Sequence, residues 1–180
     1  MRTALRIFGI LVILFALLFG TMSIWRAQRD KDDLRESRME IVEAEQSLSL
    51  LKEEAKNMTG ESKTQMNQQI ATAEEGLKKL PSESVYTTVQ MLLGFLVVIS
   101  LILGVFLFRP NLNFSRMLLV SSVVLLLAAY FASPNLERSE YSGLPSRTLA
   151  LLTGIPVVIA AVFAFLIAKN KRAESLRSGR

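Results

Sequence analysis

Residues 91–108 read MLLGFLVVISLILGVFLF, and the stretch without a charged side chain around them extends from residue 84 to residue 108. A helix needs roughly 20 residues, at about 1.5 Å each, to cross a hydrocarbon core of about 30 Å. Because hydrocarbon offers no partner for backbone N–H and C=O groups, a single segment crosses it only as a helix. This stretch therefore predicts a transmembrane helix.

Three more stretches have the same character, because residues 7–25, 117–136 and 148–168 also carry no charged side chain. The four stretches are 19 to 25 residues long, which matches one membrane thickness. A soluble protein would have to bury four helices that have no polar face, whereas a surface helix of a globular protein keeps one. We therefore expect an all-α integral membrane protein with four transmembrane helices.

The first apolar stretch follows a short basic segment, as the apolar region of a signal peptide does. It is too long for such a region, and Trp25 stands where a cleavage site needs a small residue. We therefore expect residues 1–25 to form a retained signal-anchor helix. Residues 84–168 then hold the second to fourth spans, and residues 169–180 form a basic tail.

The arm, residues 26–83, is the one long polar segment and contains 10 basic and 13 acidic residues. Apolar residues recur in it at heptad spacing, which is typical of a coiled-coil seam. The pattern breaks before Gly60, resumes after it, and ends at Pro81. We expect an antiparallel helical hairpin with a coiled-coil-like seam. The predicted interaction residues of this seam are Leu34, Ile41, Leu48, Leu51, Ile70 and Leu77.

The seam is short, and an isolated pair of helices of this length is marginally stable in water. Two alternatives stay open. The arm either packs on a second copy or on a partner subunit, or it is a mobile and partly frayed segment.

The orientation follows from the basic residues near the spans. The segment before the first span, the 109–116 loop and the tail carry nine, and the 133–147 loop on the other side carries two. Basic residues at the ends of the arm would equalise the two sides, but long loops count less. We expect both termini in the cytoplasm, the arm outside, and a bacterial inner membrane as the location. Lys169, Lys171 and Arg172 of the tail are expected to meet anionic lipid.

The residues that usually carry chemistry are missing from the sequence. The chain has no Cys and no His, which excludes thiol catalysis and Cys/His zinc sites. The four spans hold no Asp, Glu, Lys, Arg or His, which argues against a proton relay. The net charge of +5 does not indicate nucleic-acid binding, because the basic residues lie at membrane boundaries without interleaved aromatics. We predict no catalytic residue, no metal and no cofactor.

Small residues at four-residue spacing allow helix backbones to approach closely. They serve either packing among the four spans or contact with another membrane protein. The positions predicted to form such interaction faces are Ala16, Gly20, Ser100, Gly104, Ala160, Ala164 and Ala168.

These features favour a non-enzymatic structural, assembly or accessory subunit of a larger membrane complex. Such a subunit would act through the arm and the small-residue faces, with lipids and other membrane subunits as its partners. Two alternatives stay open: a membrane sensor or regulator that relays a signal from the arm, and an oligomeric pore or carrier component.

Overall fold

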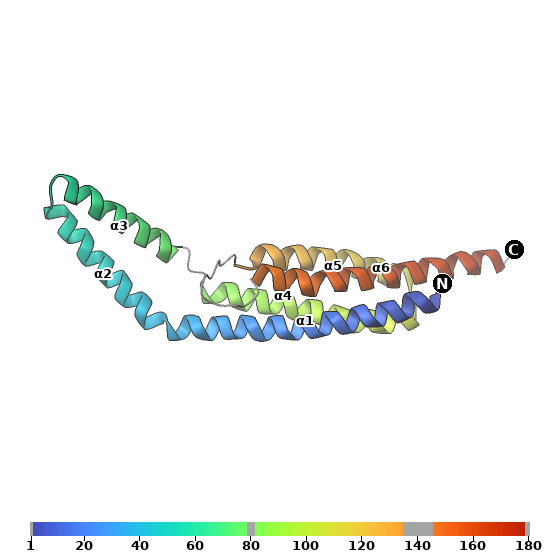
Figure 1. The fold of residues 1–180 in the computed structure, drawn as a ribbon. Helices are drawn as coiled ribbons and strands as arrows, with labels where there is room; N and C mark the ends of the chain where they lie inside the picture. The colour runs from blue at the N-terminus through green and yellow to red at the C-terminus, as the bar shows by residue number, and fades with distance from the viewer. Residues whose placement is uncertain (1, 79–81, 135–145, 179–180) are drawn as a thin grey trace. The chain divides into compact units, whose positions relative to one another are not determined.

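The computed structural model describes residues 2–78, 82–134 and 146–178 (Figure 1). These described residues form six α-helices and no strand. The helices are α1 (Arg2–Glu36), α2 (Arg38–Asn57), α3 (Glu61–Lys78), α4 (Glu83–Phe108), α5 (Leu112–Ala132) and α6 (Ser146–Ser178).

The chain divides into two compact units. The bundle unit comprises Met1–Gln28 and Ser84–Arg180, and the arm unit comprises Arg29–Glu83. The bundle unit therefore contains most of α1 together with α4, α5 and α6, whereas α2 and α3 belong to the arm unit.

Helices α1, α4, α5 and α6 are each long and apolar enough to cross a membrane. Across residues 2–78, 82–134 and 146–178, this confirms the predicted all-helical architecture with four long apolar helices. Length and composition do not test membrane insertion, which stays a prediction.

The helices extend beyond the apolar stretches that reveal them. Helix α1 continues past Trp25 to Glu36, because the charged residues there include no proline or glycine and remain compatible with a helix. Helix α5 begins at Leu112, where the Asn111 side chain accepts a hydrogen bond from the Phe114 N–H. Loss of hydropathy marks where a membrane would end and not where a helix ends.

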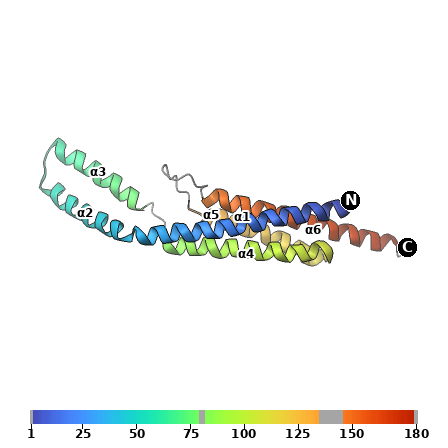
Figure 2. The ribbon, with the colours of Figure 1, turned by 60° about the horizontal axis from the view of Figure 1, so that its bottom comes forward.

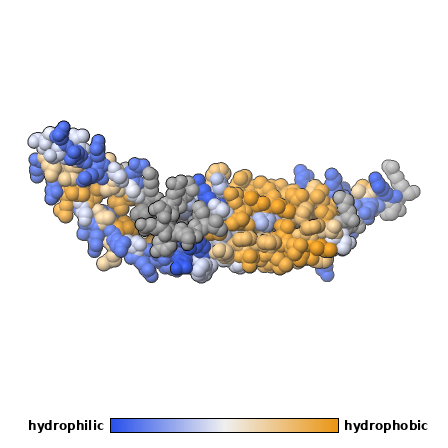
Figure 3. Space-filling view, viewed as in Figure 1, coloured by the Kyte–Doolittle hydropathy of each residue, from blue (hydrophilic) through white to orange (hydrophobic). Residues whose placement is uncertain are grey.

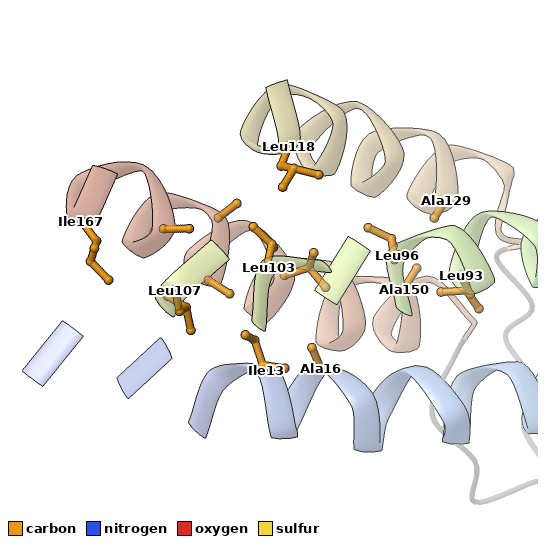
Figure 4. Packing of buried hydrophobic residues seen from close by; sticks show 14 of the residues in the cluster. Ile13, Ala16, Leu93, Leu96, Leu103, Leu107, Leu118, Ala129, Ala150 and Ile167 are labelled. Atoms are coloured by element: carbon orange, nitrogen blue, oxygen red, sulfur yellow. The ribbon is translucent and has the colours of Figure 1, made fainter. Parts of the chain in front are cut away.

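The core of the bundle unit is built from all four of its helices (Figure 4). A Cβ placed on Gly9 of α1 would meet Leu107 of α4, and one on Gly154 of α6 would meet Leu126 of α5. Two views agree that α1 and α4 lie side by side (Figure 2). Glycine at these positions lets a leucine side chain of the neighbouring helix pack directly on the glycine backbone.

The face of the bundle unit that Figure 3 shows is largely apolar. Large side chains such as Phe15, Phe95 and Phe131 are more than half exposed. A water-soluble bundle would bury such residues and expose charge, because contiguous apolar surface on soluble proteins is limited to small patches.

In the arm unit, α2 and α3 pack against each other, with Gly60 in the turn between them. Gly60 has φ of 74°, in the left-handed region that favours glycine. Lys52 of α2 forms an ion pair with Glu74 of α3. The predicted helix pair is thus present, and its coiled-coil character stays a prediction. Its small core consists of Leu48, Ala55 and Ile70, with Leu51, Met66 and Leu77 packed against them.

Candidate interaction surfaces

The small-residue faces lie inside the bundle unit. Ala16, Ser100, Ala160 and Ala164 have no exposed surface, and Ala168 is 3% exposed. Ala16, Ala160 and Ala164 belong to the apolar core, because their small side chains leave room for neighbouring helices of the same chain. These faces are occupied within one chain, and their prediction as contacts to a partner stays untested.

Of the two glycines of these faces, Gly20 lies at a close approach between helices and Gly104 does not. A Cβ on Gly20 would come within 2.5 Å of Val97 Cγ2 and 3.3 Å of Thr153 Cγ2. A Cβ on Gly104 would make an ordinary contact with Ile13, at 3.9 Å. Gly20 therefore lies where α1 meets both α4 and α6, and a larger residue there would push these helices apart.

Next to Gly20, two buried hydroxyls join α1 to α6. Ser23 Oγ and Thr153 Oγ1 are 3.0 Å apart. Each hydroxyl also lies within hydrogen-bond distance of a backbone carbonyl one turn earlier in its own helix. The carbonyl is that of Phe19 for Ser23 and that of Leu149 for Thr153. This pair has satisfied hydrogen bonds and no neighbouring base of the kind that activates a nucleophile, so its chemistry is that of a structural link.

The Ser23–Thr153 pair was not evident from the sequence, because 130 positions separate its members. A threonine hydroxyl in an apolar helix usually donates a hydrogen bond to the backbone carbonyl one turn earlier in the same helix, and it then needs no partner on another helix. The one local signal was that each hydroxyl lies near a glycine, Gly20 or Gly154.

Polar contacts hold α1 against α4 near both ends of their packed region. Gln90 Nε2 donates to Gln28 Oε1 at 2.9 Å. At the other end, Arg6 Nε donates to the Leu107 carbonyl at 3.1 Å. The Arg6 guanidinium also lies over the Phe108 ring, 5.8 Å from its centroid, a distance typical of a cation–π contact.

The base of the arm unit carries an ion-pair cluster that lies outside the charge-free stretches. Arg35 donates hydrogen bonds to Glu83 Oε1 from Nε and from a terminal nitrogen, and Lys31 Nζ lies 3.5 Å from the same oxygen. The hydrogen bonds from Arg35 lower the pKa of the Glu83 carboxyl from its ordinary value. The pair therefore stabilises the arm at neutral pH, and this contribution is lost as the pH falls through the lowered pKa.

The predicted seam residues fall into two groups. Leu48 and Ile70 are buried between α2 and α3, with Leu51 packed against them. Leu34 and Ile41 are half-buried and line a shallow groove with Leu77 near the Glu83 cluster. The seam is thus filled in its middle and open at its base.

The face of α2 opposite the seam carries exposed apolar residues that the heptad analysis missed. Met39 is 74% exposed, Val42 46% and Leu50 62%. At about 100° per residue, Met39 and Leu50 lie within about 20° of each other and roughly opposite Leu48. We call Met39, Val42 and Leu50 the outer strip of α2. A search for a second apolar periodicity in the same helix would have found it.

The basic residues of the predicted tail lie on a helix. Helix α6 continues through Lys169, Lys171 and Arg172 to Ser178, and all three side chains are exposed. Among residues 2–78, 82–134 and 146–178, no group of three His, Cys, Asp or Glu side chains could hold a metal ion.

Comparison with protein families, with characterised proteins and with solved structures finds no match for this chain. In the part of the chain that the structure describes, the fold is all-helical, and four of its helices are long and apolar enough to span a membrane.

Proposed function

We propose that this chain is an integral protein of a bacterial inner membrane, with both termini in the cytoplasm and the arm outside. The support is the apolar outer surface of α1, α4, α5 and α6, which lipid would cover. The excess of basic residues beside the termini and in the 109–116 connection favours the cytoplasm for that side.

Cysteine labelling tests this topology, because the chain has no native Cys. Thr59→Cys is preferred to a change at Gly60, whose positive φ strains any other residue. A membrane-impermeant maleimide is expected to label Thr59→Cys in intact spheroplasts. Ser175→Cys is expected to be labelled only after the membrane is opened. Labelling of both positions from one side would contradict the four-span topology.

Within the membrane, we propose that the chain is a non-enzymatic accessory subunit that holds a partner protein by its arm. The outer strip of α2 carries this proposal. Three large apolar side chains on a helix that is otherwise rich in charge have no partner within the described part of the arm unit. Single exposed apolar residues are common on surfaces, but aligned ones on one helix face are typical of a helix docking site.

The core of the arm unit supports the same proposal. Three buried residues, with three more packed against them, form a small core for two helices of 20 and 18 residues. Most helical stability in proteins comes from packing of an apolar face. A partner on the outer strip would add a second packed face to α2.

The partner is expected to contact the arm and not the small-residue faces. Ala160 and Ala164 are already covered by neighbouring helices of the same chain. Contact with a partner inside the membrane would instead use large exposed side chains, where a partner competes with lipid of similar polarity.

The test is purification of the tagged chain from its native membrane in mild detergent, followed by native mass spectrometry. A heteromer of fixed stoichiometry is expected. The double variant Met39→Gln/Leu50→Gln should lose the partner at least tenfold, because buried apolar side chains near an interface centre dominate binding. Glu40→Gln, an exposed change on the same helix, should keep it.

Three outcomes would contradict the accessory-subunit proposal. A homo-oligomer alone would favour a pore or carrier. A partner retained by the double variant would remove the outer strip from the interface. A monomer from native membranes would leave the outer strip without an occupant.

A further inference from the structure

We infer that the end of the bundle unit at which α1 begins and α6 ends is a binding surface for the phosphate headgroups of anionic lipids. We call Arg6, Arg109, Arg116, Lys169, Lys171 and Arg172 the basic face. The inference rests on the membrane insertion proposed above, and it assigns a ligand to a surface that the partner proposal does not use.

The fold brings three separate segments to this end. Arg6 of α1 bonds to the Leu107 carbonyl and so lies at the end of α4. The connection to α5 contains Arg109, and the rings of Phe106 and Phe114 stack across it at 5.3 Å.

Helix α6 runs antiparallel to α5, and this places its basic end beside the start of α5. Arg147, at the beginning of α6, donates from Nε to the carbonyl of Ser133, just past the end of α5. Leu126 and Gly154 meet further along the same pair of helices. The residues after Ala168 therefore emerge at the end where Arg6 and Arg109 lie (Figure 1).

Charge at the basic face is almost uncompensated. Within the described residues of the bundle unit, Glu174 is the only acidic side chain. Arg109, Arg116, Lys169, Lys171 and Arg172 are all exposed. Several like charges held close together repel one another, and a concentration of anions beside them relieves that repulsion.

Arg6 is held in a way that leaves it able to bind an anion. Its Nε donates to the Leu107 carbonyl, and its guanidinium carbon lies over the Phe108 ring. These contacts fix the guanidinium without a carboxylate partner. Its two terminal nitrogens remain suited to the bidentate pairing that guanidinium makes with phosphate.

The position of the basic face selects lipid as the source of the phosphate. Each of its three segments is continuous with an apolar helix that lipid tails would surround. Lipid phosphates lie at the depth where such helices leave the hydrocarbon. A nucleic-acid site would be expected to interleave aromatic side chains for stacking, and Phe106 and Phe114 are engaged with each other.

The experiment uses the full chain, purified without its partner in maltoside micelles. Dioleoylphosphatidylglycerol or dioleoylphosphatidylcholine is added, and native mass spectrometry counts the bound lipid. Phosphatidylglycerol is expected to bind at least tenfold more tightly than phosphatidylcholine. The preference should shrink as salt is raised, since screening weakens exposed charge pairs.

The key variant is Arg109→Gln/Lys169→Gln/Lys171→Gln. Each basic side chain at an anionic surface contributes about fivefold in affinity, so the triple variant should lose most of the preference. The matched control, Arg38→Gln/Lys56→Gln/Lys63→Gln, removes the same charge from exposed positions of the arm unit. It should keep the preference for phosphatidylglycerol.

Equal binding of the two lipids by the native chain would overturn the inference. So would a triple variant that keeps its preference, or a control that loses it. Displacement of phosphatidylglycerol by a DNA duplex at equal concentration would mean that the basic face binds nucleic acid and not lipid. The failure of membrane insertion itself would appear separately, in the labelling of Thr59→Cys and Ser175→Cys.

Discussion

Replacing Ala164 with leucine is expected to lower the stability of the bundle unit by about 1–3 kcal/mol, the usual cost of overpacking a filled core. Ala164 has no exposed surface and belongs to the core that all four helices of the bundle unit share. The larger side chain can be accommodated only if neighbouring helices move apart. Thermal unfolding of the purified chain in detergent, followed by loss of helical circular dichroism, measures the effect.

The control for this change lies two residues away on the same helix. Val162 is 36% exposed, so Val162→Leu adds volume toward the surroundings of the bundle and should leave the unfolding temperature nearly unchanged. Equal unfolding temperatures for Ala164→Leu and the native chain would mean that the ridge of small residues is not tightly packed. Loss of a partner from Ala164→Leu without a change in stability would place that partner on α6.

The four long apolar helices were predictable because charged side chains are costly in hydrocarbon and are therefore absent from long stretches of the sequence. The inward faces were harder to predict. In an ordinary amphipathic helix the polar side identifies the outside, but α4 has no polar side from Met91 to Phe108. The small residues gave the one usable signal, and the structure places Ala16 and Ala160 in the core.

What the sequence could not supply is the pairing of distant positions. Nothing local links Ser23 to Thr153, or Arg6 to the carbonyl of Leu107, because backbone approach decides these contacts. In the arm the heptad template found Leu48 but assigned no role to Leu50. A template with one seam cannot describe a helix that carries two apolar faces.

The second large effect is expected from replacing one of these two leucines of α2, Leu48, with aspartate, and the same change at Leu50 is its control. Leu48 is 8% exposed and packs against α3, whereas Leu50 is 62% exposed on the outer strip. Leu48→Asp should destabilise the arm unit by at least about 3 kcal/mol, because it removes a buried side chain and places a charge among apolar neighbours. Leu50→Asp makes the same chemical change where water already solvates the side chain, and should cost less than about 0.5 kcal/mol.

Limited proteolysis of the purified chain measures this difference. Leu48→Asp should cause rapid cleavage within residues 29–83 while the bundle unit survives, since the two units have separate cores. Leu50→Asp should resist protease like the native chain and yet lose the partner in co-purification. The two variants therefore separate folding of the arm from its use. Equal resistance of both variants would mean that α2 buries nothing against α3 in solution, and the arm would then be a mobile segment that folds only on its partner.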